Sequence, residues 1–556
     1  MYNLLIGGAA GQGIDTTAAV LEKLLKRSGY FVFTIRDFMS RVRGGHNFSL
    51  IRFGTEPIYS HSSHLDGIVA LDDETIMLHQ EQLNENGFIL CDSKLSAADP
   101  RLMKFDMDGM AKKLGNPRVS GIIAVGILLK LFGVSLDGAE DVLRAFVKPQ
   151  YLDINSKALL EGYQAAQERY KHLGGQYRDW MLISGNNAVA LGAATAGLRF
   201  YSAYPMSPST SIMETLASLG DEAGLVIEQA EDEIAAINMA IGASYAGARA
   251  MTGTSGGGFS LMVEALGLSG MTEIPLVVID VQRPGPVTGL PTRTEQSDLR
   301  FVISASQGEF PRMVIALRNP SDAFYQTMRA FHMAEKYQIP VILLSDQYLA
   351  DTTYTIETFD PGRIRVASSA AEYSAKGEYL RYRYSKTGVS PRLIPGRTKN
   401  LVLIDSDEHD ERGWITESAD VRTKMMDKRM KKLEGIRQEL LEPDFLGSDG
   451  YDTLLLGWGS TWGPIAEAVQ ILNHEGKGLY AALIFGDIYP LPKNLLLGKA
   501  PKAKRVINVE QNATGQLAGL IREETGIVCT GSILKYDGRQ ISGEEIADRM
   551  RKEVQK

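Results

Sequence analysis

The sequence predicts an α/β protein whose central part is a doubly wound parallel sheet. Short, almost continuously apolar segments such as PLVVIDVQ and PVILLSD alternate with longer helical segments. This alternation is typical of parallel strands covered by helices on both faces. The chain opens with YNLLIGG, AAGQG and TTAAVLEKLLKRSG, which predict a strand, a glycine turn and an amphipathic helix. Its 556 residues, 44% of them hydrophobic, suffice for roughly three or four domains.

Four regions are expected in order along the chain. Residues 1–175 form an α/β domain with strand candidates FVFTI, FSLIRF, GIVALD and GFILCD, and the polar segment 168–180 is a linker. Residues 181–360 form the parallel-sheet domain, with strand candidates from LRFYSAYP to PVILLSD. Residues 361–448 lack this alternation and are expected to form an arm or lid. Residues 449–556, with TLLLGWGS, LYAALIF and RVINVEQN, form a third α/β domain.

Composition excludes several classes of protein. A net charge of -8 argues against nucleic acid or an anionic membrane as the main partner. The basic cluster TKMMDKRMKKLEGIRQ is expected to be a solvated helix face. Cys91 and Cys529 are too few for a disulfide framework, a cysteine-rich zinc site or a four-thiolate iron–sulfur cluster. Because the N-terminus lacks the features of a signal peptide and Lys130 interrupts the apolar stretch GIIAVGILLKLFGV, we expect a cytoplasmic protein without a membrane span.

Three polar clusters follow strand candidates of the central domain. They are AYPMSPST (203–210), EQAEDE (228–233) and QRPGPVTGLPTRTEQSD (282–298). In parallel α/β sheets, ligands bind beyond the carboxyl ends of the strands. The clusters therefore mark the candidate site.

The second cluster places three carboxylates, Glu231, Asp232 and Glu233, before an apolar helix candidate at 234–247 that should be buried all round. Acidic residues in a first turn complement the helix dipole by about 0.3–1 kcal/mol each, which accounts for one or two of them. A carboxylate in an apolar setting must be paired, solvated or protonated. One of the three could thus be a neutral acid that donates a hydrogen bond to a ligand.

Ser207 and Arg283 stand in the other two clusters. Ser207 precedes Pro208, as a helix N-cap often does. Arg283 follows the strand LVVIDVQ, where a guanidinium is well placed to hold a carboxylate through two hydrogen bonds. The TSGGG turn either brings backbone close to a ligand or provides a tight bend.

The N-terminal turn GGAAGQG has the strand–turn–helix context of a phosphate site. Its glycines, Gly8, Gly11 and Gly13, do not match the G-x-G-x-x-G spacing. Asp37 follows the next strand, near where a ribose-binding acid would stand. The glycine mismatch weighs against a bound dinucleotide.

These motifs together resemble the alpha subunit of 2-oxoacid:ferredoxin oxidoreductases of the 2-oxoglutarate oxidoreductase kind, with a gamma domain fused at the N-terminus. YPMSPST, EQAEDEIAAINMAIGASYAGARAMTGTSGGGFSLMVE and QRPGPVTGLPTRTEQSDL occur in that order, with GQG and SRVRGGHNFSLIRFG before them and GVSPRLIPG, DEHDERG and VEQNATGQLAGLIRE after them. The resemblance covers essentially the whole chain. It implies a gamma-type α/β domain, a pyrimidine-type thiamine diphosphate domain and a transketolase-C-like α/β domain.

The resemblance also implies roles for individual residues. Glu231 is the carboxyl group that hydrogen-bonds N1′ of the aminopyrimidine of thiamine diphosphate, and Asp232 and Glu233 keep dipole and network roles. Ser207 and Arg283 contact the 2-oxoacid, with Ser207 standing where Thr is usual.

This chain lacks the G-D-G and asparagine stretch that holds the diphosphate and magnesium. The resemblance therefore implies a separate beta subunit that brings these ligands, Mg2+ and at least one [4Fe-4S] cluster, in an (alpha-beta)2 assembly. The implied reaction converts a 2-oxoacid, CoA and oxidised ferredoxin into acyl-CoA, carbon dioxide and reduced ferredoxin.

The substrate is left open at this point, with 2-oxoglutarate as the best guess. A dicarboxylate needs a second cation, for which Arg293, Arg383 and Arg392 are candidates. Two alternative functions are a non-catalytic scaffold or regulatory subunit of such a complex, and a nicotinamide-dependent dehydrogenase that uses the N-terminal glycine turn.

Overall fold

The computed structural model of the chain describes residues 1–39, 45–368, 378–476 and 479–554. The chain divides into two compact units. The first is made of Met1–Ser184, Asp351–Thr358 and Ser542–Glu544, and the second of Gly185–Ala350, Phe359–Ile541 and Glu545–Lys556.

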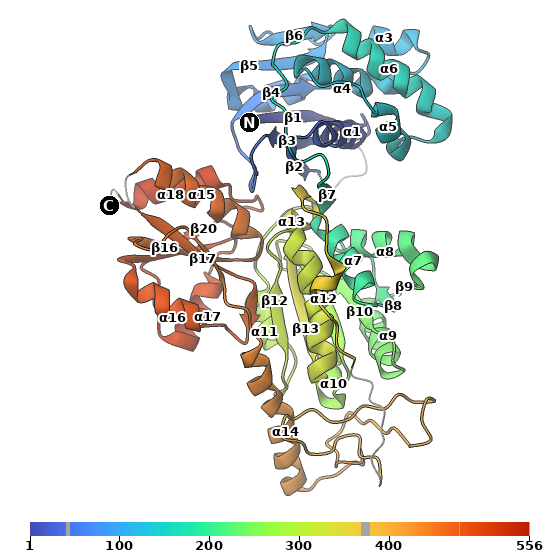
Figure 1. The fold of residues 1–556 in the computed structure, drawn as a ribbon, viewed down its shortest axis with the longest axis vertical. Coiled ribbons are helices and arrows are strands. Elements are labelled where there is room, and N and C mark those ends of the chain that lie inside the picture. The colour runs from blue at the N-terminus through green and yellow to red at the C-terminus, as the bar shows by residue number, and fades with distance from the viewer. Residues whose placement is uncertain (40–44, 369–377, 477–478, 555–556) are drawn as a thin grey trace. The chain divides into compact units, whose positions relative to one another are not determined.

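The first unit is built on a mixed sheet of eight strands in the order β6-β5-β4-β1-β3-β2-β14-β7 (Figure 1). The strands are β1 (Tyr2–Ala9), β2 (Phe31–Asp37), β3 (His46–Gly54), β4 (Leu65–Ala70), β5 (Leu83–Asp92), β6 (Leu102–Phe105), β7 (Met181–Ser184) and β14 (Thr353–Ile356). Strand β1 runs parallel to β4 and antiparallel to β3. At the other end of the sheet, β14 runs antiparallel to both β2 and β7.

The helices of the first unit pack against this sheet, α2 on one face and the others on the opposite face. They are α1 (Ile14–Arg27), α2 (Asp73–His79), α3 (Met107–Lys113), α4 (Ser120–Leu131), α5 (Ala139–Phe146) and α6 (Leu152–Ala165). Helix α4 is apolar on every side and touches α6 at two glycines. A Cβ on Gly126 would lie 2.1 Å from the Leu159 carbonyl oxygen, and one on Gly162 would lie 2.1 Å from that of Ile123. The apolar stretch of the sequence is thus a core helix held at close backbone distance.

The second unit contains a seven-stranded sheet in the order β18-β12-β13-β11-β10-β8-β9. Its strands are β8 (Phe200–Ala203), β9 (Val226–Gln229), β10 (Ala250–Thr254), β11 (Leu276–Gln282), β12 (Met313–Ala316), β13 (Pro340–Asp346) and β18 (Asp487–Tyr489). All are parallel except the edge strand β18. The parallel, doubly wound sheet expected for the central part of the chain is confirmed.

Helices cover both faces of this sheet (Figure 1). They are α7 (Gly185–Thr195), α8 (Thr210–Ala223), α9 (Glu233–Tyr245), α10 (Gly256–Thr272), α11 (Leu299–Ser304), α12 (Pro320–Tyr337) and α13 (Gln347–Asp351). Helices α9, α10 and α11 share one core with inward-facing residues of β11 and β13. Helices α7 and α12 pack together. Alternate residues of a strand point to opposite faces of the sheet. Because helices cover both faces, each strand must be apolar along almost its whole length.

A five-stranded sheet in the order β15-β17-β16-β19-β20 completes the second unit. Its strands are β15 (Asp444–Leu446), β16 (Thr453–Trp458), β17 (Tyr480–Phe485), β19 (Arg505–Glu510) and β20 (Gly531–Leu534), and the helices near it in sequence are α14 (Ala419–Gln438), α15 (Trp462–His474), α16 (Asn494–Lys499), α17 (Gln516–Thr525) and α18 (Gly543–Val554). Only β15 is antiparallel to its neighbour. This sheet confirms the α/β class of the C-terminal part.

The divisions of the chain differ from those expected at residues 181, 361 and 449. Strands β7 and β14 lie in the sheet of the first unit, β15 lies in the C-terminal sheet, and β18 adds to the central sheet. Each is a strand of three or four residues at or near a sheet edge. Strand pairing is non-local, so the local apolar pattern can identify such a strand but cannot tell which sheet it joins.

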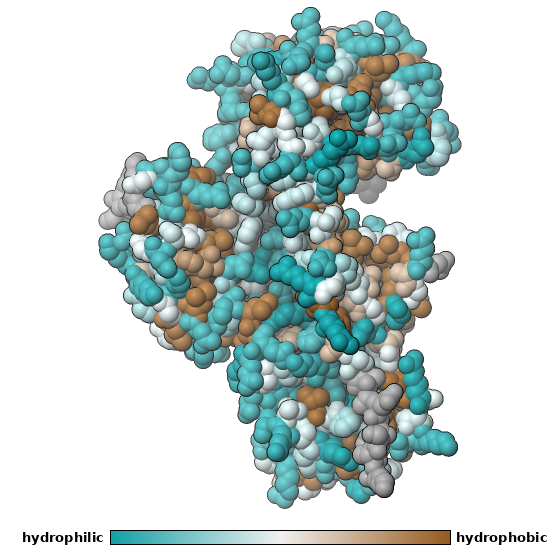
Figure 2. Space-filling view, viewed as in Figure 1, coloured by the Kyte–Doolittle hydropathy of each residue, from teal (hydrophilic) through white to brown (hydrophobic). Residues whose placement is uncertain are grey.

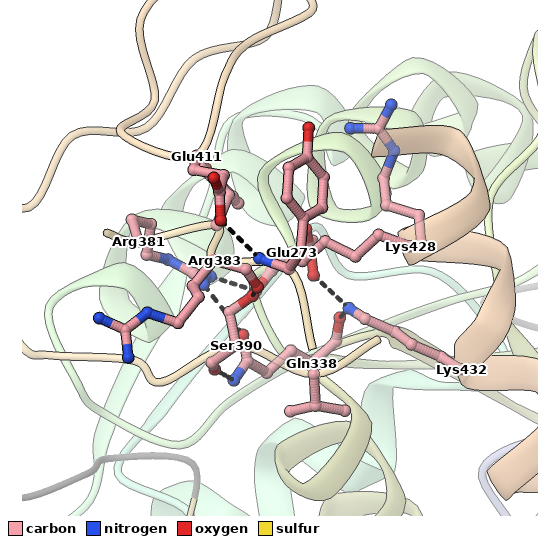
Figure 3. A network of polar contacts seen from close by, with 12 residues as sticks. Glu273, Gln338, Arg381, Arg383, Ser390, Glu411, Lys428 and Lys432 are labelled. Carbon is pink, nitrogen blue, oxygen red and sulfur yellow. Dashed lines mark hydrogen bonds and ion pairs between the residues drawn. The ribbon is translucent and has the colours of Figure 1, made fainter. Parts of the chain in front are cut away.

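The segment between the central and C-terminal sheets is fastened by a buried charge network (Figure 3). Lys428 and Lys432, one turn apart on α14, each place the ammonium nitrogen 2.6 Å from a carboxylate oxygen of Glu273, at the end of α10. Arg381 donates to Gln338 Oε1 at 3.0 Å and to the Glu273 carbonyl at 2.7 Å. Burial opposes the ionisation of Glu273, but the three neighbouring cations outweigh it and hold its pKa below the ordinary value.

The expectation that the basic cluster of α14 is a solvated face is therefore wrong. Lys428, Arg429 and Lys432 are 4%, 1% and 0% exposed. These cations can be buried because Glu273 and Glu408 pair with them. The pattern of charges along the helix cannot reveal carboxylates that are distant in the sequence.

No helix in the described ranges is long and apolar enough to cross a membrane. On the face drawn in Figure 2, apolar side chains are interspersed with polar ones.

Replacing Glu273 with Gln should destabilise the second unit, because two buried ammonium groups would lose their counter-charge. We expect the free energy of unfolding to fall by about 3–5 kcal/mol, the loss typical of removing one partner of a buried ion pair. Urea denaturation followed by tryptophan fluorescence measures it. Asp420→Asn is the matched control, because Asp420 pairs with Lys424 on the same helix but is exposed, and it should leave the curve unchanged. Coincident curves for Glu273→Gln and the wild type would contradict the prediction.

Candidate functional site

The three polar clusters of the sequence meet at one edge of the central sheet. Strands β9, β8, β10 and β11 are consecutive and parallel, so their carboxyl ends lie side by side. The loop after β8 carries Ser207, the loop after β9 carries Glu231, the turn after β10 begins with Ser255, and the loop after β11 begins with Arg283. This edge is the candidate site, where loops and helix N-termini converge.

Arg283 and Ser207 are in contact. Arg283 is 9% exposed, and its Nη1 donates to the carbonyl oxygen of Ser207 at 2.8 Å. Burial lowers the pKa of Arg283, yet a guanidinium stays charged. The Nε–H of Arg283 has no hydrogen-bond partner among the described residues. A buried cation with an unused donor can hold an anionic group such as a carboxylate.

Ser207 is not the N-cap of the helix that follows it. Helix α8 begins at Thr210, and Ser207–Ser209 form a turn in which the Ser209 hydroxyl donates to the Met206 carbonyl at 2.8 Å. The residue Ser207 is exposed at the edge of the sheet. Ser207 therefore does not cap the helix that follows it, which was the structural role that the sequence suggested.

The three carboxylates after β9 have three different environments. Asp232 is the N-cap of α9, and its Oδ1 accepts from the Ala235 backbone N–H at 2.7 Å. Glu233 is 3% exposed, and its Oε1 has no partner among the described residues. Glu231 lies in the loop and is exposed on the chain by itself. The carboxylate that this chain buries is thus Glu233, because the cap at Asp232 directs the next side chain beneath the helix.

Helix α9 is not buried all round as the sequence suggested. Ile234 and Met239 are 50% and 38% exposed, and Asn238 is exposed beside them. All faces of the helix carry small or apolar side chains, so the sequence shows no polar face. Among the described residues, however, nothing covers the face that carries Ile234 and Met239. An uncovered apolar face next to a site marks an interaction surface.

The three arginines considered as a second cation are spread over the second unit. Arg392 is buried, lies 3.8 Å from Glu335 and donates to the Ser244 carbonyl near the C-terminal end of α9. That end is roughly 18 Å from Glu231 by helix length. Arg383 lies beside Tyr382, whose hydroxyl donates to the Thr272 carbonyl at the far end of α10. Neither can serve the edge where Arg283 stands.

Arg293 remains with the site loop. It follows Arg283 in the loop after β11, and its backbone N–H donates to the Leu290 carbonyl at 3.1 Å. Its side chain is half-buried against the loop at Gly538, where an added Cβ would lie 3.2 Å from Arg293 Cβ.

Sequence reasoning missed two acids of the site, the buried Asp280 and the half-buried Asp298. Asp280 lies on β11 and is 0% exposed, and both of its oxygens lack a partner among the described residues. Asp298, at the head of α11, likewise has an unpartnered Oδ2. The available signal was a carboxylate inside the apolar strand LVVIDVQ, which is unusual for a buried strand.

The N-terminal glycine turn forms a separate cavity in the first unit, of about 460 Å³, lined among others by Gly11, Gly13, Lys94 and Arg118. Gly11 and Gly13 have φ of 95° and 80°, and a Cβ at either would meet nothing, so their conformation requires glycine rather than a lack of space. Strand β2, which ends at Asp37, is separated from β1 by the antiparallel β3. A dinucleotide fold places those strands next to each other and parallel, so the dehydrogenase alternative loses its geometric support.

Two protein-family models match the chain. One, described as pyruvate flavodoxin/ferredoxin oxidoreductase, thiamine diP-bdg, matches residues 191–428. The other, described as pyruvate ferredoxin/flavodoxin oxidoreductase, matches residues 3–165.

The chain is also similar to named proteins over most of its length. The alpha subunit of 2-oxoacid:ferredoxin oxidoreductase of Sulfolobus sp is 32% identical over 99% of this chain and 96% of that protein. The 2-oxoglutarate oxidoreductase subunit KorA of Mycobacterium tuberculosis is 36% identical over 79% of this chain and 68% of that protein. The solved 2-oxoglutarate:ferredoxin oxidoreductase of Magnetococcus marinus, with 2-oxoglutarate, coenzyme A and succinyl-CoA bound, superposes with a TM-score of 0.92 and 31% identity, covering 100% of this chain and 99% of that one.

A methyl group at Gly258 should disturb the site, because a Cβ there would lie 2.1 Å from Thr254 Oγ1 and 2.3 Å from Glu233 Oε1. We expect Gly258→Ala to cost about 1–3 kcal/mol of unfolding free energy, as overpacking of a filled interior does. Gly257→Ala is the matched control in the same turn, since its Cβ would meet only the Val287 carbonyl at 3.3 Å. Equal denaturation midpoints for the two variants would show that the Glu233 carboxylate moves aside freely.

Proposed function

The chain belongs to the 2-oxoacid:ferredoxin oxidoreductase family, and we propose that it supplies the pyrimidine half of a thiamine diphosphate site that oxidatively decarboxylates a 2-oxoacid. The observation that carries the proposal is that the loops with Ser207, Glu231 and Arg283 all leave the carboxyl edge of the sheet in the thiamine diphosphate-binding domain, where Arg283 bonds the Ser207 carbonyl.

The residues at this edge fit the pyrimidine half of the cofactor. Glu231 presents a carboxyl group that no helix cap uses, whereas Asp232 is occupied as the cap of α9. When bound, thiamine diphosphate supplies the carbanion chemistry that releases carbon dioxide from a 2-oxoacid. Glu231 would hold a proton between its carboxyl oxygen and N1′ of the aminopyrimidine.

For that role Glu231 must be shielded from water, and a second polypeptide would provide the shield. Apolar side chains surround the edge: Ile234, Leu261, Leu290 and Val287 are 50%, 50%, 48% and 85% exposed. Covering them would remove the solvent that now surrounds Glu231. A beta subunit bound to this edge would therefore shield Glu231 from water. Two such alpha-beta pairs would form an (alpha-beta)2 assembly.

Arg283 and Ser207 are proposed to bind the 2-oxoacid. The Arg283 guanidinium, fixed at one end by the Ser207 carbonyl, keeps its Nε–H for the substrate carboxylate, and the Ser207 hydroxyl is a second donor. The Magnetococcus and Mycobacterium relatives are named after 2-oxoglutarate. This substrate has a second carboxylate, for which Arg293 is the candidate cation.

The redox part of the reaction is assigned to the partner. Among the described residues no group of three or more His, Cys, Asp or Glu side chains could hold a metal ion, and Cys91 and Cys529 belong to different units. The beta subunit would bring Mg2+, the diphosphate ligands and a [4Fe-4S] cluster. The complete reaction joins the acyl group to CoA and delivers two electrons to ferredoxin, one at a time.

Glu231→Gln should abolish most turnover in a complex reconstituted with the beta subunit. Gln cannot hold the shared proton, so we expect 2-oxoglutarate- and CoA-dependent viologen reduction to fall by about 10²-fold or more. Glu228→Gln, an exposed acid of the same segment, is the control and should keep the wild-type rate. A wild-type rate for Glu231→Gln would instead favour the non-catalytic scaffold.

Arg283→Lys should weaken substrate binding while leaving the charge in place. Lys cannot both bond the Ser207 carbonyl and present a fork to a carboxylate, so KM for the 2-oxoacid should rise by about tenfold, the loss of one charge-assisted hydrogen bond. Steady-state kinetics over a series of 2-oxoacids measures this. An unchanged KM for every accepted substrate would remove Arg283 from the substrate site.

A further inference from the structure

The loop that follows β11, residues 283–297, begins and ends beside the same strand residue. Gln282 is the last residue of β11, and its Oε1 accepts from the Asp298 backbone N–H at 3.0 Å. Both arginines proposed to bind substrate carboxylates, Arg283 and Arg293, lie between these two points. The loop is therefore closed at its base, and the position of each arginine depends on what holds the loop farther out.

Gln296 joins the second half of this loop to the C-terminal sheet. Its Nε2 donates to the Trp458 carbonyl at 2.8 Å, and its backbone N–H donates to the Gln511 carbonyl at 2.8 Å. Its Oε1 accepts from the Gln511 backbone N–H at 3.2 Å, and its carbonyl accepts from Asn512 Nδ2 at 3.0 Å. All four residues are buried. A buried polar group is costly to leave without a partner, so these bonds hold Gln296 in one place.

Thr294 and Ser297 are bonded from the same part of the chain. The Thr294 backbone N–H donates to the Gly538 carbonyl at 3.2 Å, and Gln516 Nε2 donates to the Ser297 carbonyl at 2.7 Å. The Thr294 hydroxyl also accepts from the Tyr348 backbone N–H at 3.2 Å. The residues that follow the second arginine of the loop are thus fixed through their backbone.

The bonding residues come from one edge of the C-terminal sheet. Trp458 ends β16, Gln511 and Asn512 follow β19, and Gly538 lies beyond β20. These three strands are consecutive and parallel, so the loops after them emerge at the same edge. We refer to these four residues as the C-terminal clamp. None of the site residues predicted from the sequence belongs to it, yet it holds the second half of the loop.

Gly538 lies close to the start of the Arg293 side chain. A Cβ on Gly538 would lie 3.2 Å from Arg293 Cβ and 2.9 Å from Leu290 Cδ1, so the close approach depends on glycine. Arg283 is held elsewhere, by the Ser207 carbonyl at the edge of the central sheet. The two arginines of one loop are therefore fixed by two different sheets.

The spacing of two fixed cations determines which anions both can bind. A charge-assisted hydrogen bond requires a short distance and good alignment. A 2-oxoacid with a second carboxylate can reach both arginines only if Arg293 stands at the matching distance from Arg283. A 2-oxoacid with one carboxylate needs Arg283 alone. A shift of Arg293 therefore affects the first kind of substrate and spares the second.

We propose that the C-terminal clamp positions Arg293 for the second carboxylate of a dicarboxylic 2-oxoacid and so favours such substrates over monocarboxylic ones. Gly538 and Gln296 are positioning residues that act through Arg293. The C-terminal sheet thereby has a role in substrate selection without contributing a side chain to the substrate. This role rests on the proposed function, because it takes Arg283 and Arg293 as the substrate cations.

Gly538→Ala tests the clamp in a complex reconstituted with the beta subunit. The added methyl group should displace Arg293, so KM for 2-oxoglutarate should rise about tenfold, the loss of one charge-assisted hydrogen bond. KM for 2-oxobutyrate, which has one carboxylate, and kcat for both substrates should stay within about twofold, because only binding of the second carboxylate changes. CoA-dependent viologen reduction measures both substrates.

Gly526→Ala is the matched control. Both glycines have a left-handed backbone, with φ of 76° at Gly526 and 77° at Gly538, so alanine carries the same strain at either position. A Cβ on Gly526 would meet nothing within 4 Å. Gly526→Ala should therefore keep both KM values of the wild type.

Arg293→Ala shows whether Gly538 acts through this arginine. It replaces no glycine and should raise KM for 2-oxoglutarate about tenfold, again without changing KM for 2-oxobutyrate. In the double variant Arg293→Ala/Gly538→Ala, KM for 2-oxoglutarate should equal that of Arg293→Ala, because the effects of residues that act through one contact do not add.

Equal rises of KM for both substrates in Gly538→Ala, or a further rise in the double variant, would overturn the role of the clamp, since general damage to the loop has that effect. An unchanged KM for 2-oxoglutarate in Gly538→Ala or in Arg293→Ala would overturn it as well. A wild-type complex that oxidises 2-oxobutyrate but not 2-oxoglutarate would refute the selection of dicarboxylic substrates and leave the proposed function standing. A complex that oxidises no 2-oxoacid would refute the proposed function itself.

Discussion

The parallel register of β9, β8, β10 and β11 is the constraint on which the rest of the site depends. Because these strands are neighbours and point the same way, every loop that leaves them emerges at one edge. The loops carry Ser207, Glu231 and Arg283 from positions up to 76 residues apart in sequence. A single antiparallel strand inserted there would move one of these loops to the opposite edge. The site is thus a consequence of strand order, and its side chains need only short loops to meet.

Buried charge is handled in two different ways in the second unit. Glu273 is neutralised by Lys428 and Lys432, so a helix of the intervening segment is fastened to the end of α10. Asp280 has no cation partner among the described residues, and burial raises the pKa of its carboxyl group well above the ordinary value. The first arrangement joins two parts of the fold, whereas the second stands beside the candidate site. At Glu273 the neighbouring cations outweigh the cost of desolvation, whereas at Asp280 the cost of desolvation prevails.

The membership of the 2-oxoacid:ferredoxin oxidoreductase family and the exposed edge of the sheet point to a chain that works in a complex. Glu231 and apolar side chains of α9, α10 and the Arg283 loop are exposed together. An exposed apolar surface beside a candidate site is typical of a surface that binds another protein.

The sequence by itself determined the α/β class, the parallel central sheet and the three loops of the site, because each follows from local apolar periodicity and from polar residues at strand ends. The glycines of α4, α6 and the turn after β10 can also be seen in the sequence. The reason that these positions need glycine, a close contact with backbone or with a carboxylate, cannot be seen there. Only the tertiary structure decided which carboxylate is buried, which arginines reach the site and which sheet each edge strand joins. Glu233 and Asp280 are buried by packing of elements that are distant in sequence, and Lys432 is buried against the distant Glu273. A local pattern carries no information about such contacts.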